Sequence, residues 1–333
     1  MIWGVEVILL TFVVITAVGS LWIKDLMSAA IFFGAYSFLM CLVWTGMGAV
    51  DVAFTEAAVG AGISTVLIIA TIYNTKRITK DSNINLLWKS VAAVIVTIVG
   101  FGLMSAINDF PKWGDPLSPA NSHVSSYYVE HAYEDSHVPN LVTAVLADYR
   151  GFDTMFETAV VFVASISIVV LLRRFKKKRK SAPYDTNNSV IIQTSCRIMV
   201  PFMQLFALYV VAHGHHSPGG GFQGGVILGA SLILFAISYD IKSTLTKLSE
   251  KWMILSSSIG VLIFAGIGFG SMLLGSNFLD YSIWHSLLPG TDEVMARSHG
   301  MLGVEIGVAL TVMCGMFAIY THIASDGQME KGL

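Results

Sequence analysis

Nine long apolar segments dominate this sequence and restrict what it can fold into. Each is about 20 residues long, the length that an α-helix needs to cross the hydrocarbon core of a bilayer. Short polar stretches such as 74–83 separate them. The pattern predicts an all-α integral membrane protein with about nine transmembrane helices. The expected spans are residues 2–23, 27–49, 51–73, 85–107, 154–173, 195–213, 222–241, 252–275 and 299–322.

The basic residues predict the orientation of these spans, because short loops rich in lysine and arginine stay on the cytoplasmic side. Basic clusters at 76–80 and 173–180, Lys24 and the lysines between 242 and 251 occupy alternate connections. The remaining connections contain few basic residues. We therefore expect the N-terminus outside, the C-terminus in the cytoplasm and an odd number of spans.

Composition excludes several classes of protein. The chain is 54% hydrophobic and 13% charged, whereas a soluble domain has about 25% charged residues. The net charge of −2 and the position of basic residues at segment ends indicate no nucleic-acid partner. The three cysteines are far apart and form no CxxC pattern, so we expect no metal, no redox centre and no cofactor.

Two connections divide the chain into groups of three, two and four spans. The stretch 107–153 is long for a connection, and loops of this length usually carry function or disorder. Within it, "NLVTAVLADYR" at 140–150 is expected to form a short interfacial helix. The expected domains are a three-span domain at 1–82, a two-span domain at 83–175, a basic cytoplasmic linker at 176–188 and a four-span domain at 189–333.

A carboxylate interrupts the third apolar segment. Glu56 lies in "DVAFTEAAVGAGIS", and a charge at the centre of a spanning helix costs roughly 2.5–3.5 kcal/mol. The Glu56 carboxylate therefore needs a proton, a partner or water. Gly60 and Ser64 lie on the same helix face and are small enough to let another helix or water approach. We interpret Glu56 as a protonatable or cation-binding relay. The alternative is an interhelical hydrogen bond that fixes packing. Asp51, nearer the outer end, joins the candidate ion path as a hydrated carboxylate.

A second acidic pair precedes the fifth span. Asp153 and Glu157 are four residues apart and share a helix face. One carboxylate at the surface and one a turn deeper form the first steps of an ion path. Asp153 has the alternative of capping the helix, with Arg150 as its ion-pair partner.

Two further charges lie inside predicted spans. Lys89 is one turn into the fourth span, where it either extends its ammonium group to the membrane surface or points inward to a carboxylate. Glu305 in the last span presents the same choice as Glu56 between an ion path and packing. It lies on a different stripe of its helix from His299, Gly303 and Gly307.

The stretch "VVAHGHHSPGGGFQGGVILGA" at 210–230 is the most distinctive motif. Its histidines do not follow a zinc spacing, and its glycines lack the lysine of a phosphate loop. Gly219, Gly220 and Gly221 predict a tight turn between two spans, because glycine adopts backbone conformations that other residues avoid. His213 is included among the candidate ion-path residues, since imidazole titrates near neutral pH.

Several of these stretches resemble components of one family. "DVAFTEAAVGAGISTVL" is similar to the end of the large A subunit of Mrp-type multisubunit cation/proton antiporters, and to a small subunit of membrane-bound hydrogenases. "PNLVTAVLADYRGFDTMFETAVVF" resembles the neighbouring two-span subunit of those hydrogenases. "FMQLFALYVVAHGHHSPGGGFQGGVILGASLIL" resembles the B subunit of Mrp antiporters. The chain thus resembles a fusion of units that are often separate polypeptides.

The resemblance implies a subunit of a Na⁺/H⁺ antiporter in the prokaryotic inner membrane, related to respiratory complex I. It implies large A- and D-like partners and small C-, E-, F- and G-like partners, with Na⁺ and H⁺ as the transported ions. Glu56 is the implied ion-path carboxylate, and Glu157 corresponds more weakly. The alternative is an assembly subunit in the antiporter module of a hydrogenase-like redox complex, with no ion passing through this chain.

Overall fold

The computed structural model describes residues 2–79, 85–112, 114–173, 189–239, 241–325 and 327. Within these ranges the chain is helical and contains no β-strand, in agreement with the predicted all-α class. The predicted basic linker at 176–188 lies outside the described residues. The predicted domain boundaries at 82 and 175 stay predictions.

Nine helical segments of the described ranges are long and apolar enough to cross a membrane, which confirms the predicted number. They are α1 (Ile2–Trp22), α2 (Leu26–Gly46), the continuous segment α3–η1–α4 (Val50–Glu56, Ala57–Ser64, Thr65–Tyr73), α5 (Leu86–Ala106), α9 (Gly151–Leu172), α10 (Val190–His213), α11 (Gly221–Tyr239), α13 (Glu250–Leu273) and α14 (Glu293–Ala324). The short helices are η2 (Ile107–Asp109), α6 (Pro119–Ser122), α7 (Val124–Ser136), α8 (Leu141–Thr143), η3 (Ala144–Tyr149), α12 (Ile241–Lys247) and η4 (Tyr281–Ser286). The orientation of the spans in the membrane stays a prediction.

Helix ends differ from those that hydropathy predicts. The helix α14 has 32 residues, whereas a bilayer requires about 20. It begins at Glu293 rather than 299, because Asp292 caps it by accepting a hydrogen bond from the Met295 N–H at 2.7 Å. Likewise α9 begins at Gly151 rather than 154. Apolar runs therefore locate the spans, and at α14 a capping side chain marks where the helix begins.

The third span contains a π-helix that the apolar pattern does not predict. The segment η1 covers eight residues immediately after Glu56. Such helices have i→i+5 hydrogen bonds, are rare and frequently occur at functional sites. A run of apolar residues does not distinguish a π-helix from an α-helix, because both kinds of helix can be built from the same apolar residues.

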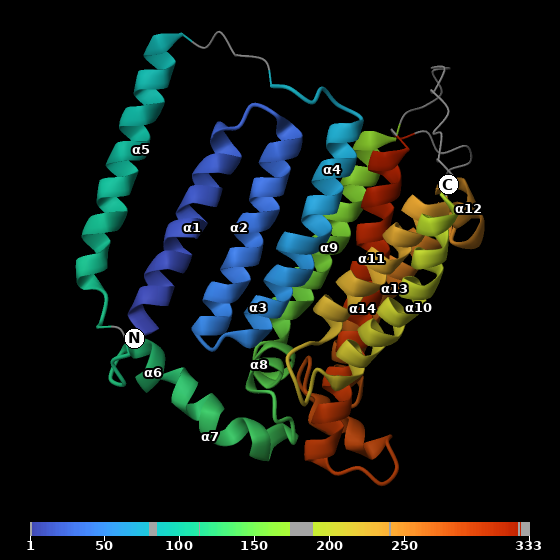
Figure 1. Ribbon diagram of the computed structural model, residues 1–333. Helices are drawn as coiled ribbons and strands as arrows, with labels where there is room; N and C mark the ends of the chain where they lie inside the picture. The colour runs from blue at the N-terminus through green and yellow to red at the C-terminus, as the bar shows by residue number, and fades with distance from the viewer. Residues whose placement is uncertain are drawn as a thin grey trace. The chain divides into compact units, whose positions relative to one another are not determined.

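The chain forms two compact units, and the larger one contains Met1–Arg77 and Ala132–Leu333. Its central helix is α14, drawn in red in Figure 1, which packs against α9, α11 and α13. The apolar part of α14 is 67% buried, compared with 6% for α1. The helix α10 packs on α11, and α3–η1–α4 packs between α2 and the pair α11 and α14.

The smaller unit covers Ile78–His131 and contains α5, η2, α6 and the first residues of α7. Within this unit α5 buries none of its residues. Lys89 is the fourth residue of α5, and its side chain is exposed. Its exposure near a helix end is the arrangement in which a lysine reaches the membrane surface.

The connection at 107–153 is more helical than its composition indicates. The expected helix at 140–150 appears as α8 followed by η3, with Asn140 accepting a hydrogen bond from the Val142 N–H at 3.0 Å as N-cap. The sequence does not predict the helix α7. Its residues, VSSYYVEHAYEDS, have no clear apolar period, so hydropathy gives no signal for it.

Candidate functional site

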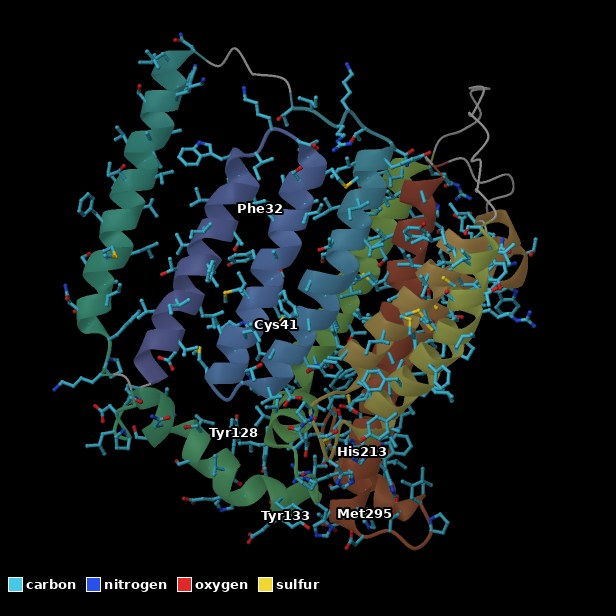
Figure 2. All side chains as sticks on the ribbon, in the orientation of Figure 1. Phe32, Cys41, Tyr128, Tyr133, His213 and Met295 are labelled. Carbon is cyan, nitrogen blue, oxygen red and sulfur yellow. The ribbon has the colours of Figure 1, made fainter. Side chains whose placement is uncertain are left out.

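The connection between α10 and α11 is a tight turn built on glycine. Gly219 and Gly220 have φ angles of +155° and +125°, values that residues with a Cβ rarely adopt. The Gly220 N–H donates a hydrogen bond to the Val210 carbonyl at 3.1 Å and so folds the connection back onto the end of α10. His213, labelled in Figure 2, is the last residue of α10.

Glu305 of α14 lies directly against this turn. A Cβ at Gly220 would be 3.0 Å from the Glu305 Oε1, and a Cβ at Gly221 would collide with the Glu305 backbone carbonyl. Glu305 is 8% exposed. On another face of α14, Gly307 approaches Gly260 of α13. Glu305 therefore lies close beside the turn because Gly220 and Gly221 have no side chains to occupy this space.

Asp51 contacts the same turn from the first residues of α3. Its Oδ1 accepts a hydrogen bond from the Gly219 N–H at 3.1 Å and one from the Asn140 Nδ2 at 3.4 Å. The side chain is half-buried. The turn therefore has a carboxylate on each side, with Asp51 bonded to Gly219 and Glu305 beside Gly220.

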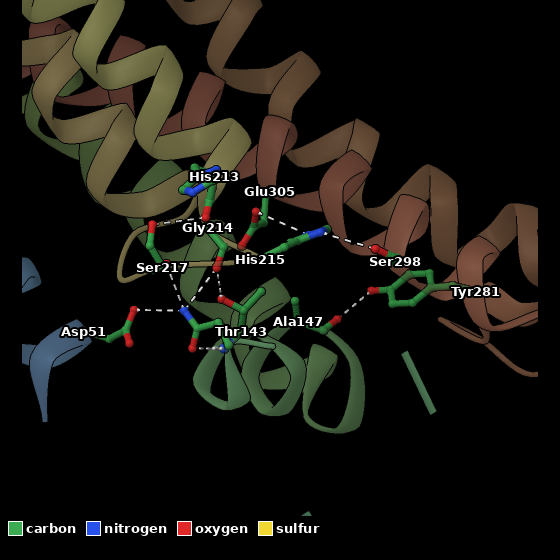
Figure 3. Close-up of polar contacts among 11 residues, drawn as sticks. Asp51, Thr143, Ala147, His213, Gly214, His215, Ser217, Tyr281, Ser298 and Glu305 are labelled. Atoms are coloured by element: carbon green, nitrogen blue, oxygen red, sulfur yellow. Dashed lines mark hydrogen bonds and ion pairs between the residues drawn. The ribbon is translucent and has the colours of Figure 1, made fainter. Parts of the chain in front are cut away.

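Asn140 connects Asp51 to the turn. Its Nδ2 lies 3.1 Å from both the Gly214 and the Ser217 carbonyl oxygens, and its backbone N–H donates to the His215 carbonyl at 2.9 Å. Figure 3 shows these contacts between the turn and the helices below it. Segments around residues 51, 140 and 214–219, far apart in sequence, therefore meet through backbone and side-chain hydrogen bonds.

His215 faces Glu305 from within the turn. The His215 Nε2 and the Glu305 Oε2 are 3.9 Å apart, and both side chains are about one-tenth exposed. The other ring nitrogen, Nδ1, lies 3.3 Å from the Ser298 hydroxyl (Figure 3). Neither the Nε2 nor the Oε2 has a hydrogen-bond partner among the described residues. The His215 Nε2 and the Glu305 Oε2 are thus two buried polar atoms that face each other without forming a hydrogen bond.

Burial determines the charge of His215. Burial, together with smaller contributions from the neighbouring His216 and His299, lowers the pKa of His215 to about 4. The imidazole is therefore neutral at pH 7, and the contact with Glu305 is not an ion pair of opposite charges. A neutral ring with a free Nε2 is a proton acceptor beside a buried carboxyl group.

A surface pocket of about 320 Å³ opens next to the turn. It is lined by residues of three segments: Gly48, Ala49, Val50, Asp51 and Val52; Pro139, Asn140, Leu141 and Val142; and His216, Ser217 and Pro218. A volume of this size holds several waters or a hydrated cation. Asp51 is the carboxylate in its wall, so the pocket brings solvent to one side of the turn.

A polar contact leads from the turn toward Glu56. The Gln223 Nε2 donates a hydrogen bond to the Thr55 Oγ1 at 2.8 Å, which links α11 to α3. The neighbouring Glu56 is half-buried, and its carboxylate lies over Gly60 together with the hydroxyl of the buried Ser37. No hydrogen bond to the Glu56 carboxylate is formed by the residues described here. Glu56 thus lies on the same helix as Asp51, at the last residue of α3, and its carboxylate lies beside Ser37 of α2.

Two other candidate residues lie apart from the turn. Asp153 is the third residue of α9 and pairs with Arg150, whose Nε is 2.7 Å from the Asp153 Oδ2. Arg150 is the N-cap residue of α9, so the capping alternative for Asp153 does not hold. Glu157, one turn further along α9, is exposed and forms no ion pair within the described part of the chain. Both carboxylates are therefore available to solvent or another subunit.

His213 is part of a small aromatic stack rather than of the carboxylate contacts. Its ring lies 4.8 Å from that of Tyr209, one helical turn earlier, and 5.4 Å from that of His216. It is half-buried. The structure therefore brings Asp51 and Glu305 together at the turn, with His213 next to it at the end of α10.

Three family descriptions match successive parts of the chain. Residues 191–318 match the family described as a domain related to the MnhB subunit of Na⁺/H⁺ antiporter. Residues 11–77 match the family of the D subunit of MBH, and residues 90–188 match that of the E subunit of MBH. The order of these matches is that of a D-like, an E-like and a B-like part in one chain.

The B subunit of the Na⁺/H⁺ antiporter of Bacillus subtilis is 30% identical over 131 residues, which cover 38% of this chain and 91% of that protein. The chain belongs to the family of Na⁺/H⁺ antiporter B subunits. Its B-like part is the segment of α10, α11, α13 and α14, which includes the glycine turn and Glu305.

Two longer proteins match almost the whole chain. The probable K⁺/H⁺ antiporter A/B subunit of Rhizobium meliloti is 24% identical over 325 residues, which cover 87% of this chain and 32% of that protein. The structure of the Mrp complex from Dietzia sp. matches with a TM-score of 0.78 and 24% identity over 98% of this chain and 35% of the other. The chain thus spans about a third of each of these two longer chains, and the second match establishes similarity of fold.

The site draws on all three matched parts of this antiporter B-subunit relative. Asp51 and Glu56 lie in the D-like part, Asn140 lies in the E-like part, and His215 and Glu305 lie in the B-like part. No one part contains both carboxylates that face the turn. The turn site therefore combines residues of all three matched parts.

Sequence reasoning does not identify four residues of the turn site: Asn140, His215, Gln223 and Ser298. Asn140 has a usable signal, since asparagine before an apolar run predicts an N-cap. His215 lies in the HGHH motif, but the spacing does not indicate which ring turns inward. Gln223 and Ser298 have no signal in the sequence, because their roles depend on how α3 and α14 pack.

Proposed function

We propose that the chain is a membrane subunit of a multisubunit Na⁺/H⁺ antiporter in a prokaryotic cytoplasmic membrane, and that the turn site forms part of the ion path. Family membership supports the antiporter assignment. The role of the site is supported by the position of its two carboxylates. In this proposal the chain is a transporter subunit that catalyses no covalent step.

The observation that carries the proposal is the contrast between Asp51 and Glu305 across the glycine turn. Asp51 lines a pocket of about 320 Å³ and accepts a hydrogen bond from the turn, so its carboxylate is placed to attract a hydrated cation. Glu305 is 8% exposed and has an oxygen without a partner among the described residues. A buried carboxyl group in this condition favours the protonated form or recruits water.

His215 gives the buried carboxyl group a route for its proton. The free Nε2 of the neutral imidazole faces the Glu305 Oε2 at 3.9 Å, so a small movement or one water connects them. A cation at Asp51 raises the positive potential around the turn, which favours loss of the Glu305 proton. Competition between Na⁺ and H⁺ for this region is the elementary event of an antiporter.

Glu56 is proposed as the next residue of the ion path after the turn site. The Gln223–Thr55 hydrogen bond links α11 to the residue before Glu56, and the small residue Gly60 leaves space at the Glu56 carboxylate. Glu157 and Asp153 on α9 are proposed to attract cations at the surface, and Lys89 of α5 is proposed as a charge at the membrane surface.

The partners in this proposal are large A- or D-like and small C-, E-, F- and G-like antiporter subunits. The chain offers apolar faces for them, since α1 and α10 expose many large apolar side chains. The D-like and E-like matches carry the description MBH, which supports the second candidate, an assembly subunit in a redox-linked complex with no ion in this chain.

The test compares charge-neutral variants in the intact complex. Glu305→Gln and Glu56→Gln are expected to assemble normally and to reduce Na⁺/H⁺ exchange in membrane vesicles at least tenfold. Glu293→Gln, an exposed glutamate at the start of the same helix α14, is the matched control and is expected to keep wild-type exchange.

Two outcomes would contradict the proposal. Wild-type exchange in both Glu305→Gln and Glu56→Gln would remove these carboxylates from the ion path. Loss of complex assembly in both variants, with exchange per assembled complex unchanged, would favour the assembly role instead.

A further inference from the structure

A second pair of buried ionisable groups lies at the other end of α14 from the glycine turn. His322, in the last turn of α14, is 0% exposed, and Glu250, the first residue of α13, is 5% exposed. The His322 Nε2 and the Glu250 Oε1 are 3.2 Å apart. Neither side chain belongs to the ion path described above. Charged residues are almost never buried in this way unless they are paired.

The geometry brings together two side chains that can share a proton. The His322 Nδ1 lies 2.9 Å from the Ala318 carbonyl, which can only accept, so Nδ1 carries a hydrogen. In a neutral ring the Nε2 would then be an acceptor facing a carboxylate oxygen. Two acceptors at this distance repel each other, so either the ring or the carboxyl group holds a further proton.

The helix ends favour the ionised form of this pair. Glu250 lies at the N-terminus of α13 and His322 at the C-terminus of α14, and helix dipoles stabilise negative and positive charge at these respective positions. Both Glu250 oxygens and the His322 Nε2 lack a well-aligned hydrogen bond among the described side chains, so the pair is not locked by further partners.

Arg173 gives Glu250 a second partner. The Arg173 Nη2, at the end of α9, lies 3.6 Å from the Glu250 Oε2, and the Arg173 side chain is 24% exposed. Of the other groups near this end, α4 contributes the uncharged Asn74, whose Nδ2 donates to the Ile323 carbonyl, and Lys251 of α13 is exposed. If His322 loses its proton, Glu250 still has the positively charged Arg173 as a partner.

We propose that Glu250, His322 and Arg173 form a second proton-holding site, in which His322 gains and releases a proton while Glu250 exchanges partners between His322 and Arg173. No bond other than those to the proton changes. This inference rests on the proposed function and deepens it. His322 follows Glu305 by seventeen residues on α14, about 25 Å along the helix axis. The helix would therefore carry one proton acceptor near each end of a bilayer core that is about 30 Å thick.

The test measures protonation directly in the purified, assembled complex. Infrared difference spectra recorded between two pH values, with ¹⁵N-labelled histidine, report imidazole titration without an ion gradient. We expect an imidazole signal that His322→Gln removes and that His215→Gln and Glu56→Gln leave in place. Because the signal requires no exchange, it stays interpretable if the proposed ion path is wrong.

Removing the charge of Glu250 or of Arg173 is expected to shift the midpoint of this signal in opposite directions. Glu250→Gln removes the negative partner of the imidazolium and is expected to move the titration midpoint of His322 by at least one pH unit to lower pH. Arg173→Gln removes a competing positive charge and is expected to move it to higher pH. Arg197→Gln, an exposed arginine on α10, is the matched control and is expected to leave the midpoint unchanged.

A spectrum of His322→Gln identical to that of the wild type would overturn the proposal. A midpoint that Arg173→Gln does not move would also overturn it, and this second measurement decides the question if His322→Gln or Glu250→Gln fails to assemble. Loss of Na⁺/H⁺ exchange in Glu56→Gln with the imidazole signal intact would support both proposals independently.

Discussion

Asp148 and Arg297 join η3 to the first turns of α14 through a close ion pair. The Arg297 Nη2 and Nε lie 2.7 and 2.8 Å from the same carboxylate oxygen, Oδ2. Asp148 has an 8% exposed side chain, and burial raises its pKa, while the charge of Arg297 partly opposes this shift. The ring of Tyr149 lies 5.6 Å from the guanidinium group. The pair holds the E-like and B-like parts together.

Removing one member of this pair is expected to destabilise the protein. Asp148→Asn leaves the Arg297 charge partly buried without its counter-charge, which costs about 3 kcal/mol. The measurement is the thermal unfolding of the purified complex. The double variant Asp148→Asn/Arg297→Gln is expected to recover part of this loss, because it removes the unpaired charge. A double variant as unstable as the sum of both single variants would show that the pair is not the cause.

A side chain at the glycine turn is expected to disrupt the packing of α14. Gly221→Ala places a Cβ against the backbone carbonyl of Glu305, which cannot move without displacing the helix. We expect a loss of about 3 kcal/mol, as in overpacked cores, and a fall in assembled complex. Gly266→Ala is the control, since a Cβ there has no neighbour within 4 Å. Equal yields of complex from both variants, measured by size-exclusion chromatography, would contradict the close approach.

His215 is expected to make the turn sensitive to acid. Its folded-state pKa of about 4 is lower than the ordinary value of 6.5. Above pH 6.5 both the folded and unfolded states are neutral, so the full stability is present. As the pH falls toward 4 the unfolded chain takes up a proton that the folded chain refuses. Stability should therefore decrease across this range by up to about 3 kcal/mol.

The His215→Gln variant tests this dependence. It is expected to flatten the decrease in unfolding temperature between pH 6.5 and pH 4, whereas His123→Gln, an exposed histidine of the smaller unit, keeps the wild-type slope. An unchanged slope in His215→Gln would assign the acid sensitivity to other groups.

Replacing Asn140 with aspartate is expected to destabilise the turn. Its Nδ2 donates toward two carbonyl oxygens and the Asp51 carboxylate. Asn140→Asp replaces this donor by a negative oxygen that faces three acceptors, which costs about 3 kcal/mol or more. Proteolysis rates of the complex measure the opening of the turn. Asn121→Asp, an exposed asparagine, is the control, and equal rates for the two variants would refute the bridging role.

The sequence predicts the spans and the turn because both depend on local properties. About 20 apolar residues make a spanning helix wherever they occur, and the run of Gly219, Gly220 and Gly221 permits a sharp turn on its own. Capping is also local, yet hydropathy does not identify Asp292 as the start of α14, and α14 is longer than predicted. These differences arise where a polar stretch continues a helix beyond the apolar run.

The partners of the carboxylates are not predictable in this way. The sequence marks Glu305 as an acid inside a span, but its position against His215 depends on how α14 packs on the turn. The same holds for Asp51, whose hydrogen bonds come from residues 89 and 168 positions away. Asp153 shows the reverse case, since its partner Arg150 is three residues away and is predicted from spacing.

The meeting of three matched parts around Asn140 has a consequence for assembly. Where such parts are separate polypeptides, each contact between them must overcome lost translational and rotational freedom, an association cost of about 4–15 kcal/mol. In one continuous chain the contacts around Asp51, Asn140 and the glycine turn form intramolecularly, at a high effective concentration. Fusion also fixes the stoichiometry of the three parts at one to one to one, so the two carboxylates at the turn can never be synthesised in unequal numbers.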